Sequence, residues 1–211
     1  MESNYNSFNI KEIRNVSSNI DPIFIQRWSP RAFSGDPIDE KVVAQVLEAG
    51  RLAPSSGNTQ PWVVVYAHRE TPDWDTLFSL LVEANQAWVK NGAVLFLFLS
   101  RTVSKKGHSL VTHSFDTGSF WMSMALEAFR IGFPLHGMAG FDYERARSAL
   151  HIPDIYHVDA MACMGVPGPL ETLSEQNRER EAPSFRKSLE EIAVKANRAT
   201  NGLPDFKLKA S

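Results

Sequence analysis

Hydrophobic positions recur along this chain with two different periods, which predict alternating helices and strands. In the segment 39–53, apolar residues return every three or four positions, as on one face of a helix. Asp39 is placed to cap the first turn, and a contact between Ile38 and Val43 would fix the entry of the chain. We expect this helix to end at Pro54.

Three short apolar runs predict β-strands. The run 62–67 is rich in β-branched residues, and the run 93–99 is apolar throughout, as in a strand with both faces buried. A third strand-like run covers 157–164.

Helical spacing also occurs at 73–90, at 114–131, in a shorter stretch at 143–150 and in a C-terminal stretch at 188–198. Helices and strands thus alternate without a domain break, which indicates a single α/β or α+β domain. Alternation alone favours a parallel, doubly wound sheet.

Composition narrows the class of protein. The 211 residues include 43% hydrophobic and 22% charged residues, as in an ordinary globular domain. The polar, aperiodic ends, 1–20 and 199–211, are expected to be arms. A net charge of −2 gives no broad footprint for nucleic acid or an anionic membrane, so we expect neither as a partner.

The single cysteine, Cys163, excludes an intrachain disulfide and a cysteine-rich zinc site. The N-terminus lacks the apolar core of a signal peptide, and the longest apolar run is too short to span a bilayer. We therefore expect a cytoplasmic protein and a small-molecule ligand.

The first segment with candidate chemistry is RWSPRAF at 27–33. Side chains at alternate positions of an extended chain point to the same side, so Arg27, Ser29 and Arg31 are placed to converge on one anion. Guanidinium groups form forked, charge-assisted hydrogen bonds to phosphate. Two surface arginines on a loop remain the alternative.

The second segment is APSSGNTQPW at 53–62, which is dense in hydrogen-bonding groups on a backbone stiffened by two prolines. Its backbone N–H groups and the amides of Asn58 and Gln60 would suit the polar edge of a flat heterocycle. An ordinary connecting turn would have the same composition, so both interpretations stay open.

Two weaker segments lie further along the chain. In HGMAGF at 136–141, Gly137 and Gly140 allow a ligand to approach the main chain, although their spacing is not that of a dinucleotide fingerprint. In FRKSLEEI at 185–192, Arg186 and Lys187 precede a helix that Ser188 would cap, which is a suitable place for a phosphate. Solvated basic residues are the alternative there.

Few residues of the chain support a metal site or a serine-hydrolase active site. His108 and His113 are five positions apart, which does not place two imidazoles on one helical face, and no G-x-S-x-G elbow occurs. We expect no metal site.

Taken in order, these segments resemble the nitroreductase family of flavoproteins. The matching positions are Arg27, Ser29, Arg31 and Phe33 in the first segment and Pro54, Ser55, Asn58, Gln60, Pro61 and Trp62 in the second. The resemblance continues through 85–88, 160–168 and Arg186, and it covers roughly residues 22–198 of a single domain.

The resemblance implies an α+β, three-layer fold with a mostly antiparallel central sheet flanked by helices, so the parallel sheet should give way to it. It also implies an intertwined homodimer with FMN at the interface. The FMN-binding residues implied for one protomer are Arg27, Ser29, Arg31, Asn85, Gly140 and Arg186. Those implied for the other protomer are Pro54, Ser55, Ser56 and Asn58.

The activity implied is a ping-pong transfer of hydride from NADH or NADPH, through FMN, to a nitroaromatic, quinone or similar electron-poor acceptor. The cofactor carries the redox chemistry, so no catalytic side chain is expected. Ala139 stands where some nitroreductases have a glutamate, and no lysine accompanies Asn85. Reductive dehalogenation, flavin destruction and FMN binding without turnover remain alternatives.

Overall fold

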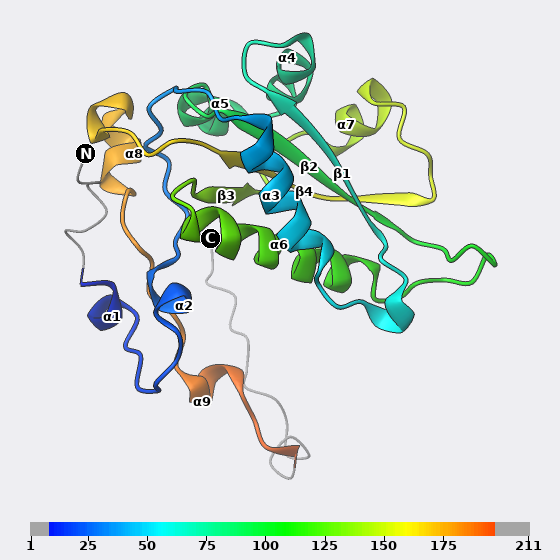
Figure 1. Ribbon diagram of the computed structural model, residues 1–211, viewed down its shortest axis with the longest axis horizontal. Helices are drawn as coiled ribbons and strands as arrows, with labels where there is room; N and C mark the ends of the chain where they lie inside the picture. Colours follow the sequence, from blue (N-terminus) through cyan, green and yellow to red (C-terminus); the bar gives the residue numbers. More distant parts are fainter. Residues whose placement is uncertain (1–8, 197–211) are drawn as a thin grey trace, which may run out of the picture.

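The computed structural model describes residues 9–196, and its centre is one four-stranded antiparallel sheet (Figure 1). The strand order is β1-β2-β4-β3. The strands are β1 (Trp62–His68), β2 (Val94–Arg101), β3 (Leu135–Met138) and β4 (Tyr156–Met164). The three strands predicted from the sequence are confirmed, and β3 is additional.

Every pair of neighbouring strands is antiparallel, so the α+β fold is confirmed and the parallel sheet favoured by alternation is wrong. Alternation misleads because a helical connection between two strands does not by itself fix their relative direction. The chain returns from β1 through two helices and still enters β2 in the opposite direction.

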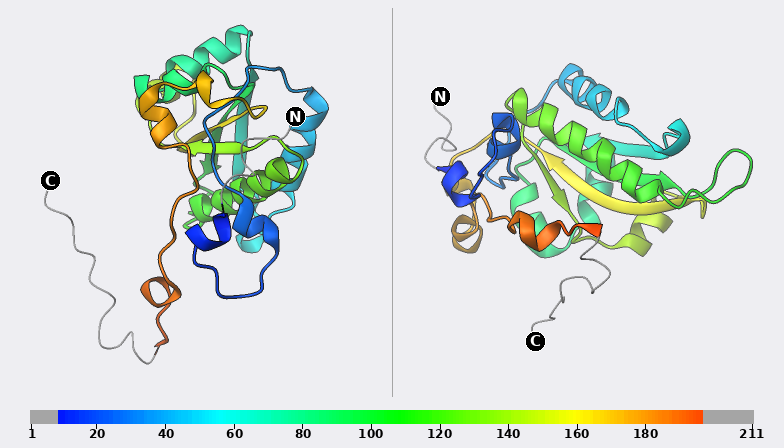
Figure 2. Two further views of the ribbon diagram at one scale, coloured as in Figure 1. Left: turned by 90° about the vertical axis from the view of Figure 1, so that its left-hand side faces the viewer. Right: turned by 90° about the horizontal axis from the view of Figure 1, so that it is seen from below.

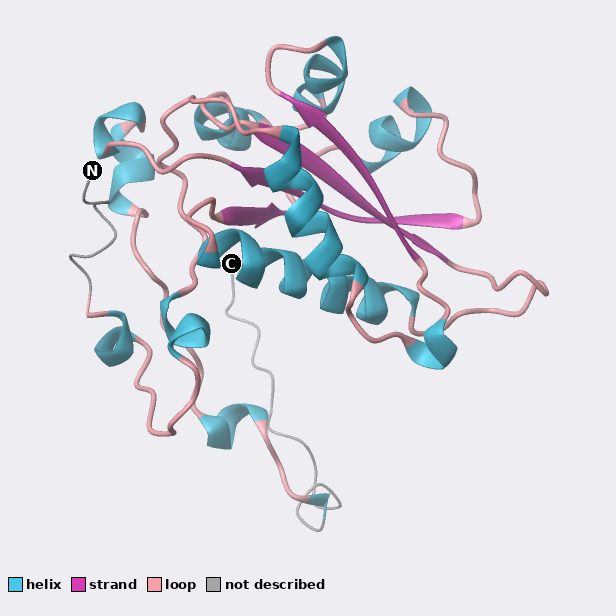
Figure 3. Cartoon of the chain, in the orientation of Figure 1, coloured by secondary structure: helices cyan, strands magenta, loops and turns pink. Residues whose placement is uncertain are grey.

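Helices cover both faces of the sheet, which gives the expected three layers (Figure 3). One face carries α3 (Glu40–Arg51) and α6 (His113–Arg130), and the other carries α4 (Pro72–Ser79), α5 (Glu83–Val89) and α7 (Tyr143–Ala149). Asp39 caps α3 as predicted, because its side chain accepts a hydrogen bond from the Lys41 backbone N–H at 2.7 Å.

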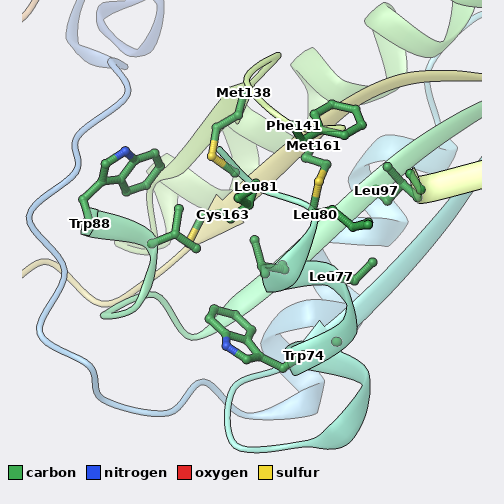
Figure 4. Packing of buried hydrophobic residues seen from close by; sticks show 14 of the residues in the cluster. Trp74, Leu77, Leu80, Leu81, Trp88, Leu97, Met138, Phe141, Met161 and Cys163 are labelled. Atoms are coloured by element: carbon green, nitrogen blue, oxygen red, sulfur yellow. The ribbon is translucent and has the colours of Figure 1, made fainter. Parts of the chain in front are cut away.

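The central strand β2 explains how one sheet supports two cores. Successive side chains of a strand point to opposite faces, and all but the last residue of β2 are buried. Leu95 and Leu97 belong to the core under α4 and α5, where Trp74 and Trp88 also pack (Figure 4). The alternate residues, Val94, Phe96 and Phe98, join the core under α3 and α6.

The predicted helix over 73–90 is in fact two helices, α4 and α5. Between them Leu81 forms an isolated antiparallel bridge with Phe141, and the Val82 backbone N–H donates to the Gly140 carbonyl at 3.1 Å. These tertiary hydrogen bonds replace helical ones, so periodicity alone could not show the break.

The C-terminal helix predicted over 188–198 is also shorter than expected. Within the described residues, α9 (Leu189–Ile192) forms, 193–195 are not helical, and 197–198 lie outside the part that the structure describes. Leu189 and Ile192 are exposed, so the described chain offers no packing that would extend a helix here.

The remaining elements are short. They are α1 (Ile10–Ile13), α2 (Pro22–Gln26), η2 (Ser56–Asn58), η3 (Leu170–Thr172) and α8 (Glu175–Glu179). In Figure 2 the chain beyond α8 extends away from the body through α9. None of the helices within residues 9–196 has both the length and the apolar character needed to cross a bilayer.

Candidate functional site

The structure brings Arg27, Ser29, Arg31 and Arg186 together around one pocket of about 260 Å³. The first three follow α2, and Arg186 comes from the segment before α9, more than 150 positions later. The Arg27 Nη1 donates to the Ser29 hydroxyl at 3.4 Å. The remaining lining residues are Trp28, His136, Arg180, Ala182 and Ser184.

A buried carboxylate holds the segment 27–33 in place. The Glu181 carboxylate, just after α8, accepts hydrogen bonds from the backbone N–H of Arg31 at 2.7 Å and of Ala32 at 2.8 Å. On the other side, the Gly168 N–H donates to the Ala32 carbonyl at 2.8 Å. The backbone around the pocket is therefore fixed from two directions.

The pocket is electropositive. Burial, followed by repulsion from Arg186, lowers the pKa of Arg27. Burial also lowers the pKa of Arg31, while Glu181 opposes this and Arg180 adds to it. These guanidinium groups are partly desolvated, and their positive charge is not fully balanced by a carboxylate. They suit an anion with several acceptor oxygens, such as a phosphate.

His136 forms a neutral wall of the pocket. Its Nδ1 lies 3.0 Å from the Pro30 carbonyl oxygen, and its ring packs on Trp88 with centroids 4.6 Å apart. Burial, with smaller contributions from Arg31 and Arg27, lowers the pKa of His136 to about 4. The imidazole is therefore neutral at pH 7, and its Nδ1 carries the proton because a carbonyl only accepts.

A second cavity, of about 400 Å³, meets the first at Ser29, which lines both. It lies between α6 and the strands β2, β3 and β4. The lining residues besides Ser29 are Phe98, Ser114, Thr117, Gly118, Trp121, Gly137, Met138, Ala139, Asp159 and Ala160. A cationic space and a largely apolar space thus lie on either side of one residue, Ser29.

Asn85 and Gly140 lie next to each other beyond this apolar end. The Asn85 Nδ2 donates to the Gly140 carbonyl at 3.0 Å, and the Trp88 Nε1 donates to the Asn85 Oδ1 at 3.3 Å. A Cβ added to Gly140 would lie 2.7 Å from the Asn85 Nδ2 and 3.1 Å from a Val82 methyl. Only glycine fits at this position without displacing Asn85.

The loop with Pro54, Ser55, Ser56 and Asn58 lies elsewhere. It lines neither cavity, and Figures 1 and 2 place η2 at the far end of the body from α2. Asn58 is exposed and has a left-handed backbone, with φ 52°. Within one chain, this loop and Arg27 do not share a site.

Several residues of the pocket were not predicted from the sequence. His136 belongs to the HGMAGF segment, but only the glycines were singled out there. Arg180 and Ser184 line the pocket and Glu181 holds its backbone, but all three lie in a polar stretch with no motif or periodicity that points to them. Lys187 does not line the pocket, although Arg186 does.

No group of three or more His, Cys, Asp or Glu side chains suited to a metal ion occurs in the part of the chain that the structure describes.

Comparison with known proteins identifies the family of this chain. A model of the nitroreductase family matches residues 25–73. A crystal structure described as an oxidoreductase containing FMN is 40% identical, with a TM-score of 0.83, covering 87% of this chain and 94% of its own. The chain belongs to the nitroreductase family.

Curated relatives of this nitroreductase family member differ in their described activity. A 5,6-dimethylbenzimidazole synthase from Rhodospirillum rubrum is 51% identical over 43 residues, and that match covers only 20% of each chain. An NADH dehydrogenase from Thermus thermophilus is 25% identical over 205 residues, covering 81% of this chain and 92% of the relative. Membership in the family therefore leaves the reaction open.

Proposed function

We propose that this protein binds FMN and transfers hydride from NADH or NADPH to an electron-poor acceptor such as a nitroaromatic or a quinone. The observation that carries the proposal is the meeting of the cationic pocket and the apolar cavity at Ser29. FMN has the same asymmetry, because a phosphate and a flat, largely apolar ring system lie at its two ends. The crystal structure at 40% identity, described as containing FMN, supports this assignment.

The residues present fit the group. Arg27, Arg31 and Arg186 would hold the phosphate, and the Ser29 hydroxyl would add a donor at the junction of the two spaces. Beside the apolar cavity, the backbone N–H of Gly140 would approach the ring and Asn85 would address the pyrimidine edge, since the bare Cα of Gly140 leaves room for Asn85. When bound, the flavin supplies the hydride chemistry, and the chain supplies binding and orientation.

The loop 54–58 belongs to this proposal as a contribution from a second copy of the chain. Its distance from Arg27 within one chain prevents it from completing its own site. In a symmetric dimer, the loop of each protomer would reach the flavin of its partner.

The outer face of α6 supports such a dimer. Phe115 is 77% exposed there, and Met122, Leu126 and Phe129 follow at helical spacing with part of their surface exposed. Figure 2 (right) shows α6 uncovered along most of its length. A continuous apolar stripe on an uncovered helix is typical of a surface that another molecule buries.

Gly118 lies one turn from Phe115 and from Met122 on α6, and it also lines the apolar cavity. A Cβ added there would meet no atom within 4 Å, yet glycine inside a helix costs about 1 kcal/mol relative to alanine. A flat group in the cavity, or the close approach of a second α6, would account for it. The exposed Phe185 and Leu189 of the C-terminal segment would cover further partner surface.

The deciding experiment is an absorption spectrum of the purified protein followed by anaerobic titration with NADH and with NADPH. The proposal expects bound FMN whose absorption bleaches with at least one nucleotide and recovers when an acceptor is added. Donor and acceptor would occupy the same place in turn, so initial rates should give parallel double-reciprocal plots. FMN that no nucleotide reduces would indicate a binding protein without turnover.

Product analysis separates the alternatives that keep FMN. Mass spectrometry of the mixture after turnover should show reduced acceptor and intact flavin. Loss of flavin in proportion to turnover would indicate a reaction that consumes the flavin, and release of halide from a halogenated acceptor would indicate dehalogenation.

A further inference from the structure

Arg14 is a buried arginine that no sequence motif singles out. It follows α1 and is only 7% exposed. Its Nη1 donates to two carbonyls near the end of α2, those of Phe24 at 3.2 Å and Ile25 at 2.6 Å. The residue therefore ties α1 to the segment that leads directly into Arg27.

The rest of its guanidinium group has no protein partner among residues 9–196. Its Nε and Nη2 atoms are buried without a hydrogen bond, and no carboxylate in that part of the chain forms an ion pair with Arg14. The charges that act on it are those of Arg186 and Arg27, two residues of the cationic pocket. Burial, followed by repulsion from these two, lowers the pKa of Arg14 to about 10.

Arg14, Arg27 and Arg186 thus carry like charges, and Arg186 lowers the pKa of the other two. No carboxylate within residues 9–196 forms an ion pair with any of the three. A buried charge is costly unless it is paired, and the two carbonyls from α2 supply only partial negative charge. An anion held by Arg27 and Arg186 would bring the missing negative charge into the same region. It would stabilise Arg14 without contacting it.

We propose that Arg14 is a third positive charge of the anion pocket, and that an anion bound there holds the N-terminal segment 9–26 against the body. The proposal rests on the function inferred above, since the natural anion would be the FMN phosphate. Arg14 would then be a positioning residue that favours a phosphorylated flavin over riboflavin.

Reciprocity makes this coupling testable from both sides. If docking of segment 9–26 places Arg14 in the field of Arg27 and Arg186, anion binding must strengthen that docking as much as docking strengthens anion binding. Ordering of the segment therefore becomes a readout that does not require a flavin.

Two variants separate charge from hydrogen bonding. Arg14→Gln retains a donor for the carbonyl groups of α2 but removes the charge, whereas Arg14→Lys retains the charge. With full-length protein stripped of flavin, Arg14→Gln should raise the dissociation constant of FMN about five- to tenfold and leave that of riboflavin unchanged. Arg14→Lys should restore most of the preference for FMN. Equal weakening of both flavins, or no change in either, would overturn the proposal.

The second measurement is hydrogen–deuterium exchange of residues 9–26 with and without inorganic phosphate. Phosphate should slow exchange of this segment in the parent chain and in Arg14→Lys, but not in Arg14→Gln. Identical exchange with and without phosphate in the parent chain would overturn the inference. Should phosphate protect the segment while FMN and riboflavin both fail to bind, the flavin function falls and the role of Arg14 stands.

Discussion

The backbone N–H of Ser56 donates a hydrogen bond to the Oδ2 of Asp116, at 3.2 Å. Asp116 is only 3% exposed, and the same oxygen accepts from the Thr112 hydroxyl at 3.1 Å. A carboxylate near the start of α6 thus fixes the loop in which Gly57 and Asn58 have left-handed backbones, with φ values of 56° and 52°. Gly57 adopts this conformation without strain, whereas Asn58 must be held in it by its surroundings.

We expect Asp116→Ala to loosen this loop and weaken FMN binding, because it leaves the Ser56 N–H and the Thr112 hydroxyl without their shared acceptor. Loss of a buried acceptor of this kind costs about 1–3 kcal/mol. Asp116→Asn keeps an acceptor oxygen and should be affected much less. The measurement is a flavin titration beside a thermal melt. Equal flavin affinity in all three proteins would show that the loop takes no part in binding.

Arg27→Ala should weaken FMN binding far more than Arg130→Ala. Arg27 lines the cationic pocket, whereas Arg130 is exposed and pairs with Glu127 on the surface of α6. A charge-assisted contact contributes about 1.5–3 kcal/mol, so the dissociation constant should rise by one to two orders of magnitude. Fluorescence titration measures it. Similar losses in both variants would contradict the phosphate assignment.

Glu181→Ala should disrupt the same pocket indirectly. It removes the acceptor of the Arg31 and Ala32 N–H groups, at a cost of about 1–3 kcal/mol per unsatisfied group. The midpoint of urea unfolding should fall and FMN affinity should fall with it. Glu181→Gln retains one acceptor oxygen and serves as the control. An unchanged midpoint for Glu181→Ala would mean that water replaces the carboxylate at little cost.

Complementation tests the dimeric site directly. Arg27→Ala and Asn58→Ala are each expected to be defective as homodimers. If Arg27 and Asn58 serve one site from different chains, a heterodimer of the two has one site with both lesions and one site with neither. A doubly tagged, purified heterodimer should then recover about half of the parental activity.

A different activity of the heterodimer is expected if one chain supplies both residues to a site. With both residues supplied by the same chain, every site in the heterodimer keeps one lesion, and activity stays at the level of the homodimeric variants. That result would require the dimer model to be abandoned.

His136 should make the protein less stable in acid. Its pKa is about 4 in the folded protein and near 6.5 when unfolded, so between these values the unfolded chain binds the additional proton. The unfolding free energy should therefore fall as the pH drops from 6.5 to 4, by up to about 3 kcal/mol from this residue. Below pH 4 both states are protonated, and this contribution changes no further.

The check is urea unfolding of the parent chain, His136→Gln and His108→Gln across this range. His136→Gln should show the shallower decline, because other titrating groups are common to all three proteins. His108 is exposed and serves as the matched control. A parallel decline in all three would show that His136 does not resist protonation.

The sequence by itself determined the main local elements. The helix capped by Asp39 and the strand buried on both faces, β2, formed where the pattern of apolar residues placed them. Periodicity succeeds here because burial of one face acts on neighbouring positions of the same segment. The convergence of Arg27, Ser29 and Arg31 was also predictable, since side chains two positions apart in an extended segment point to the same side.

Only the tertiary structure decided which distant segments meet. The break before Val82 depends on a hydrogen bond to Gly140, and the position of Arg31 depends on Glu181. The opposite directions of neighbouring strands follow from the path of the chain between them. The role proposed for Arg14 would likewise depend on its contact with the end of α2, which leads into Arg27. These contacts join residues that are far apart in the sequence, and neither segment shows a pattern that indicates its partner. The free energy of such a contact therefore cannot be derived from either segment alone.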